Sequence, residues 1–139
     1  MKWHIENESL GFQTCSKLKE SVPKGNFSSI VLETALKYAS TDVNVTLRSD
    51  NLSYIEHLVT QIIGLCSVKN FKFDMMTEDH DSIYKSTRVE SNQPKDSDCW
   101  YIALSKIGFS KDGGTSYHFH LSKRSKNFHL TLIYDKHMI

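Results

Sequence analysis

The sequence contains little cysteine, no excess of charge of one sign and no long hydrophobic run. Its three cysteines are widely spaced and none forms a CxxC pair, which argues against a disulfide framework or a thiolate zinc finger. No apolar run approaches the ~18 residues that a membrane span needs. The first residues lack the apolar segment of a signal peptide. We therefore expect a cytoplasmic protein that has no membrane segment.

The charges are nearly balanced, because 17 basic residues accompany 16 acidic ones and the net charge is +1. A protein that grips nucleic acid with its whole surface needs a positive field to displace counterions, so only a local basic patch remains open. The sequence also lacks a P-loop, a GxSxG motif and a glycine-rich phosphate loop. These absences favour a non-enzymatic binding protein, such as an inhibitor, an immunity-type protein or an adaptor, that contacts another protein.

The chain has the size and composition of a single globular domain. It has 139 residues, of which 39% are hydrophobic and 24% charged. Periodicity predicts helices and strands in alternation through the first half. The expected helices are 8–22, 29–40 and 53–66, and the expected strands are 2–6, 43–48 and 71–75. The strand–helix–strand order over residues 43–75 predicts either a βαβ crossover or a helix that joins strands of a mixed sheet.

Capping and breaking residues predict where these helices begin and end. Pro23 and Gly25 are expected to end the first helix. Ser28 or Ser29 can cap the second, since a serine oxygen accepts a free backbone N–H. Ser53 begins a Ser-x-x-Glu capping box for the third.

The second half begins with a polar stretch and ends in strands. Residues 77–98 are expected to form a long, mobile polar connection, with room for a short strand at Ile83–Val89. The strands expected after it are 99–109, 117–122 and 128–134, joined by turns at 111–114 and 123–126. The predicted fold is α+β, in one domain over residues 1–139. A mixed, mainly antiparallel sheet carries two or three helices on one face and ends in a β-meander.

The last two strands have the clearest alternation. A register that pairs Lys123 with Lys126 places His120 opposite His129. Because side chains alternate between the faces of a strand, one face is apolar and must face the core: Tyr117, Phe119, Leu121, Phe128, Leu130, Leu132 and Tyr134. The other face is polar: His118, His120, His129 and Thr131.

Three histidines on one face of a strand pair are candidate metal ligands. His118 and His120 are two residues apart on one strand, and His129 lies on the next. Zinc accepts three nitrogen ligands at roughly 2.0–2.1 Å and keeps a fourth position open in catalytic sites. The pattern resembles the metal-binding strand pair of α-carbonic anhydrases. The resemblance covers only these two strands, so it implies a zinc site and not that family's activity.

The same histidines could act as acid and base without a metal, one imidazole taking a proton and another giving one. His120-Leu-Ser122 and His129-Leu-Thr131 are similar to the His-x-Ser/Thr motif of the 2H phosphoesterases. In that family the two motifs lie in separate halves of a duplicated fold, whereas these two are nine residues apart. The alternative function is therefore a small hydrolase or nuclease that uses His118, His120 and His129. The third interpretation is an ordinary polar sheet exterior.

Tyr101 and a basic hairpin tip are the candidate partner-binding residues. Tyr101 is expected on the face opposite Trp100, which alternation assigns to the core. Lys123, Arg124 and Lys126 form the basic tip. It could bind the phosphates of a nucleic acid or an acidic partner, or it could simply keep the sheet from aggregating.

Overall fold

The computed structural model describes residues 1–7, 10–38, 42–68, 72–74, 76–80, 84–88, 100–109, 114–123 and 126–138. This part of the chain contains three helices and eight strands. Their bounds are β1 Trp3–Asn7, α1 Phe12–Lys24, α2 Phe27–Lys37, β2 Val43–Ser49, α3 Leu52–Val68, β3 Lys72–Asp74, β4 Met76–His80, β5 Tyr84–Arg88, β6 Tyr101–Phe109, β7 Gly114–Lys123 and β8 Lys126–Tyr134. The α+β prediction is confirmed.

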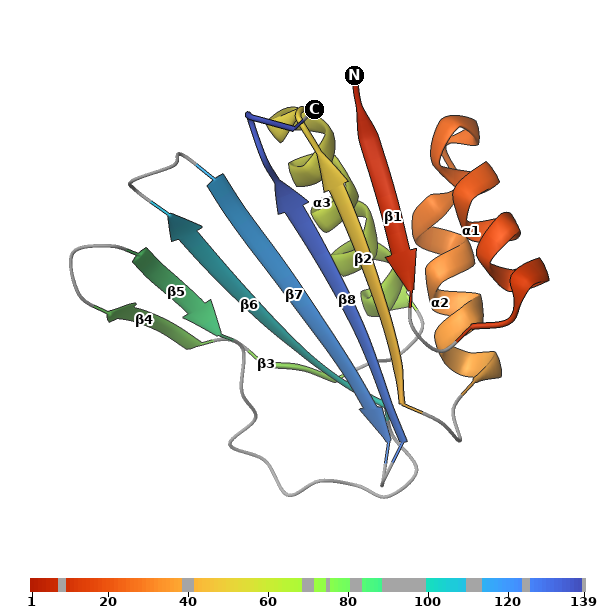
Figure 1. Cartoon of the computed structure of the whole chain (residues 1–139). Helices are drawn as coiled ribbons and strands as arrows, with labels where there is room; N and C mark the ends of the chain where they lie inside the picture. The colour runs from red at the N-terminus through yellow and green to blue at the C-terminus, as the bar shows by residue number, and fades with distance from the viewer. Residues whose placement is uncertain are drawn as a thin grey trace.

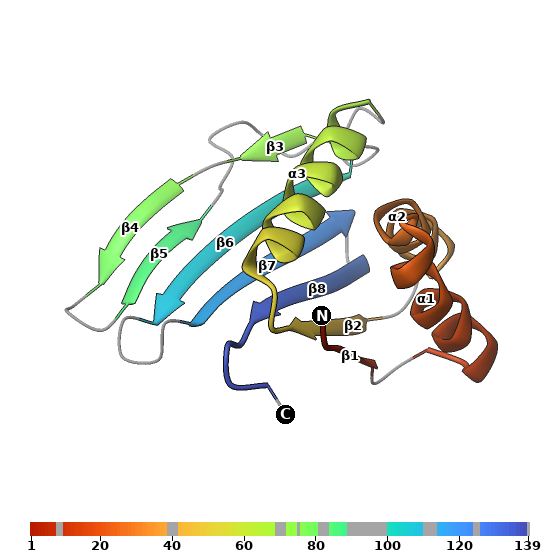
Figure 2. The same ribbon diagram turned by 90° about the horizontal axis from the view of Figure 1, so that it is seen from above.

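The strands form one sheet in the order β1-β2-β8-β7-β6-β5-β4, and β3 pairs with β6 beside β5 (Figure 1). The β2–β8 and β3–β6 pairs are parallel, while the remaining pairs are antiparallel. This confirms a mixed, mainly antiparallel sheet that ends in a meander. Figure 2 shows the three helices on one side of the sheet. No helix in the described ranges is long and apolar enough to cross a membrane.

The helix α3 is a crossover between parallel strands that are not neighbours. β2 is parallel to β8, which is antiparallel to β7, which in turn is antiparallel to β6. Because β3 is parallel to β6, β2 and β3 run in the same direction with three strands between them. The sequence left open a βαβ crossover or a helix that joins strands of a mixed sheet. The structure combines the two, since the crossover lies within a mixed sheet.

The ends of α1 and α2 differ from the prediction. Pro23 lies inside the last turn of α1, because its fixed φ is compatible with a helix, and the helix ends at Gly25 in the left-handed conformation (φ 78°). Neither Ser28 nor Ser29 caps α2, which begins before both. The hydroxyl of Ser28 is instead directed at α3, where it donates to the side-chain oxygen of Gln61 at 3.2 Å.

The helix α3 is capped by Asn51 and not by Ser53. The side-chain oxygen of Asn51 accepts the backbone N–H of Tyr54 at 3.0 Å, which is the usual geometry of an N-cap three residues ahead. Ser53 lies within the first turn. Asparagine and serine are similarly good caps, so the pattern alone could not decide between them.

The predicted connection at 77–98 contains paired strands. β4 and β5 form an antiparallel hairpin, and β5 pairs with β6. β5 falls within the short strand predicted at Ile83–Val89, while residues 81–83 and 89–98 lie outside the described residues. Sheet pairing joins backbone groups, so a polar segment can pair without the apolar alternation on which the prediction relied.

The core lies between the helices and the inner face of the sheet. The predicted β7–β8 register is confirmed, including Lys123 opposite Lys126 and His120 opposite His129. Of the residues that the sequence assigned to the core, Tyr134 is partly buried. The others are buried: Tyr117, Phe119, Leu121, Phe128, Leu130 and Leu132.

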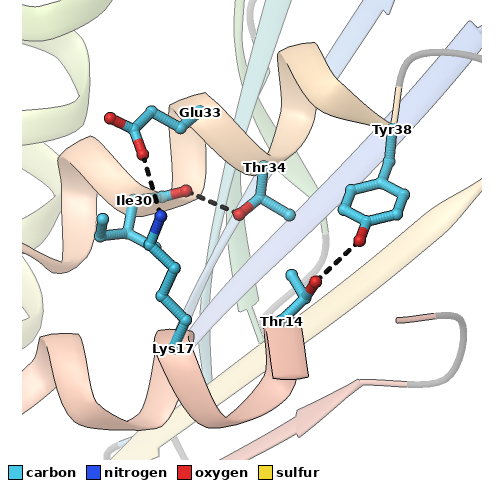
Figure 3. A network of polar contacts seen from close by, with 6 residues as sticks. All are labelled: Thr14, Lys17, Ile30, Glu33, Thr34 and Tyr38. Atoms are coloured by element: carbon cyan, nitrogen blue, oxygen red, sulfur yellow. Dashed lines mark hydrogen bonds and ion pairs between the residues drawn. The ribbon is translucent and has the colours of Figure 1, made fainter. Parts of the chain in front are cut away.

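Polar contacts join α1 to α2 at the outside of the helical layer (Figure 3). The hydroxyls of Thr14 and Tyr38 lie 2.7 Å apart, and Lys17 forms an exposed ion pair with Glu33 at 3.6 Å. Exposed ion pairs contribute little. The buried residues of both helices therefore hold this layer in place.

The cap of α3 can be tested by two matched substitutions. We expect Asn51→Ala to lower the free energy of unfolding by ~1 kcal/mol, because the N–H of Tyr54 loses its acceptor. Ser53→Ala should change it by less than about 0.5 kcal/mol. Urea denaturation of both variants measures the difference. A larger loss for Ser53→Ala would show that the predicted capping box is the true cap.

Candidate functional site

The sheet face opposite the helices carries the histidines, and we call it the outer face. The strand registers place its side chains in rows across β2, β8, β7 and β6. One row contains Asn44, His129, His120 and Ala103. The next contains Thr46, Thr131, His118 and Ser105. Every one of these residues is at least partly exposed. The predicted polar face of the last hairpin is therefore the centre of a wider polar surface.

His118 and His129 are joined edge to edge by a hydrogen bond between ring nitrogens. Nε2 of His118 lies 3.0 Å from Nδ1 of His129. The ring centroids are 5.2 Å apart and the ring planes differ by 14°. The distance between the ring centroids exceeds the distance between the two facing nitrogens by about two ring radii. Both nitrogens therefore lie close to the line that joins the centroids, and the rings meet at their edges. One ring donates its N–H and the other accepts it.

His120 stacks on His129 and begins a second chain of hydrogen bonds. The two ring centroids are 4.4 Å apart and the planes differ by 10°. Nε2 of His120 lies 2.7 Å from the side-chain oxygen of Asn127. Asn127 in turn donates its amide N–H to the carboxylate of Asp42 at 3.1 Å. The contacts link two strands, β7 and β8, and the residue that precedes β2.

A metal ion shared by His118 and His129 does not fit this geometry. Zinc binds nitrogen at roughly 2.0–2.1 Å, but the two facing nitrogens are 3.0 Å apart in line. Among the residues that the structure describes, no three His, Cys, Asp or Glu side chains are grouped to hold an ion. Zinc binding by His118, His120 and His129 stays a prediction, and it requires this hydrogen bond to break first.

Burial keeps the histidine pair uncharged. It lowers the pKa of His118 to about 4, with further lowering from His129 and His120. The pKa of His129 is also lowered, mainly by burial and then by His120, while Asp42 raises it. Both rings are therefore neutral at pH 7. They can exchange hydrogen bonds with a partner but add no positive charge to the surface.

The structure describes the side chains of two of the candidate partner-binding residues, Tyr101 and Lys123. Tyr101 lies on the outer face, as predicted, but is only 6% exposed, so partner binding through its side chain stays a prediction. Its side chain is directed away from the core yet is still buried, and alternation along the strand cannot predict burial on the outer face. Lys123 is half-buried at the end of β7. Arg124 and the side chain of Lys126 lie outside the described residues, so the basic tip stays a prediction for nucleic acid.

Two residues of the site were missed in the sequence. Asn127 is two residues before His129, so alternation on β8 could have placed it on the outer face. Asp42 could not have been found, because it reaches Asn127 only through the parallel pairing of β2 with β8.

An open cleft of about 570 Å³ lies at the N-terminal end of β1. Its lining residues are Met1, Lys2, Trp3, His4, Arg48 and Met138. The lining is basic because the β1–β2 register places His4 opposite Arg48. His4 already has an acidic neighbour, since its Nε2 lies 2.9 Å from the carboxylate of Glu6.

Comparison of the chain with protein-family models, with curated proteins and with solved structures finds no match.

The half-buried histidine pair predicts a loss of stability in mild acid. The ordinary histidine pKa of about 6.5 applies to the unfolded chain, whereas that of His118 is about 4 in the folded protein. The unfolded state therefore takes up protons first as the pH falls. The contribution of His118 to stability is fully present above about pH 6.5 and is lost as the pH falls towards 4.

Urea denaturation across this pH range measures the effect. We expect His118→Gln to remove a pH-dependent term on the order of 1–2 kcal/mol, because solvent screens part of the ring. His57→Gln, at an exposed histidine of α3, is the control and should keep the wild-type slope. Equal slopes for wild type and His118→Gln would contradict the prediction.

Proposed function

We propose that the protein is a non-enzymatic binding protein that acts through contact with another protein, and that the partner docks on the outer face. The observation that carries the proposal is the mutual engagement of the imidazoles. His118 and His129 use facing nitrogens on each other, and His120 uses one on Asn127. A catalytic or metal site would instead direct these nitrogens at one common point.

The composition of the outer face also supports a protein partner. Its central rows combine small polar side chains with imidazole rings, of which those of His118 and His129 are neutral. The helices cover only the opposite face (Figure 2). Interfaces are depleted in charged residues at their centre. The nearly even charge of the chain fits a neutral contact surface better than a phosphate-binding one.

The experiment is affinity capture from the native host followed by mass spectrometry, with two matched arginine substitutions. Thr131→Arg places a bulky cation at the centre of the outer face. Thr60→Arg places the same group on the exposed side of α3. We expect wild type and the Thr60→Arg variant to capture the same partner protein. The Thr131→Arg variant should bind that partner at least about tenfold more weakly, a loss of ~1.4 kcal/mol of binding free energy.

The alternative function is an outcome of the same experiment. A protein captured equally by all three forms, or no protein at all, would contradict docking on the outer face. The purified chain is then assayed on phosphodiester and ester substrates. Turnover that His129→Ala abolishes would favour a hydrolase that uses His118, His120 and His129.

A further inference from the structure

The strand β1 is the last strand on its side of the sheet, and its outward edge has a defined set of backbone groups. In the described residues β1 pairs only with β2. The carbonyl of Lys2 accepts the N–H of Asp50 directly opposite it. Because hydrogen-bonded and non-bonded pairs alternate along an antiparallel ladder, His4 and Glu6 also direct their backbone groups at β2.

The backbone groups of Trp3, Ile5 and Asn7 therefore point away from the sheet. The other side of β2 supports this assignment independently, since the carbonyl of Ser49 accepts the N–H of Asp135, which follows β8. The backbone groups of odd-numbered residues in β2 thus point towards β8, and those of even-numbered residues point towards β1. Trp3, Ile5 and Asn7 present three N–H and three C=O groups in a row, the arrangement to which another strand can pair.

We propose that a second copy of this chain pairs with this edge, β1 antiparallel to β1, with Ile5 opposite Ile5 of the second copy. In this register Trp3 faces Asn7 of the second copy, and Asn7 faces its Trp3. Each of these three pairs exchanges two hydrogen bonds. All the outward backbone groups of Trp3, Ile5 and Asn7 are then satisfied.

Side-chain hydrogen bonding between imidazole and carboxylate selects the same register. With Ile5 at the centre, His4 lies opposite Glu6 of the second copy, and Glu6 lies opposite its His4. Shifting the register by two residues in either direction keeps the same backbone groups paired. These shifts place His4 opposite His4 of the second copy, or Glu6 opposite its Glu6. Unlike pairs stabilise a sheet and like pairs destabilise it. Two unconnected properties, the direction of the backbone groups and the pairing of imidazole with carboxylate, therefore favour one alignment.

The outer-face side chains that would meet, those of His4 and Glu6, are accessible. They are 55% and 62% exposed and already lie 2.9 Å apart within one chain. Two copies would bring together four such groups, alternately imidazole and carboxylate, on the outer face. The nearest helical neighbour, α1, packs chiefly on α2. The result is one continuous sheet through both copies, related by a two-fold axis.

Sedimentation equilibrium of the whole chain tests the dimer. We expect a species of twice the 16.0 kDa chain mass at tens of micromolar. Glu6→Lys should weaken association about tenfold, because two-fold symmetry repeats each unfavourable contact. The exchange His4→Glu/Glu6→His should restore it, since the opposed pairs are regained with the residues reversed. Glu56→Lys, an equal charge change on exposed α3, should have no effect.

A second variant tests the backbone contribution. Asn7→Pro removes one N–H from the outward edge, where a strand tolerates proline, and should also weaken association. Circular dichroism and thermal denaturation check that each variant stays folded. A monomeric wild type at all concentrations up to about 1 mM would overturn the proposal. So would a dimer that neither Glu6→Lys nor Asn7→Pro weakens, because it would use another surface.

Discussion

The parallel pairing of β2 with β8 holds the two halves of the chain together. It joins residues 43–49 to residues 128–134 along the full length of β2. On one side of this pair lies β1, and on the other lies the meander of β7, β6 and β5. The helix α3 contacts both strands of the pair, so the apolar sides of β2 and β8 form the floor of the core.

The histidine arrangement depends on the same pairing. Three of its contacts arise within the β7–β8 hairpin, where His129 lies beside both His118 and His120, and His120 contacts Asn127. The chain of hydrogen bonds from His120 through Asn127 ends at Asp42, at the entry to β2. A carboxylate from the first half of the protein thus helps to hold an imidazole of the second. The site is a property of the assembled sheet and not of the hairpin alone.

Local periodicity predicted those features that depend on near neighbours in the sequence. The alternation at 117–122 and 128–134 was sufficient for the β7–β8 register, because one hairpin turn and one buried face determine it. The sequence could not separate Asn51 from Ser53 as a cap, since both residue types have the required oxygen. It predicted the short strand that contains β5 but not β4, whose pairing with β5 needs no apolar pattern. The contact of Asp42 with Asn127 arises from strands far apart in the sequence.

The position of β8 determines the order in which the fold can form. β2 is complete by residue 49, but its partner is made about 80 residues later along the chain. Closing so large a loop makes this pairing intrinsically slow. Until it closes, Val43, Val45 and Leu47, which are buried in the finished protein, belong to a strand with an open edge. Another chain can offer its own β8 to that edge, so this topology leaves open a route to misfolding in which copies exchange their last strand.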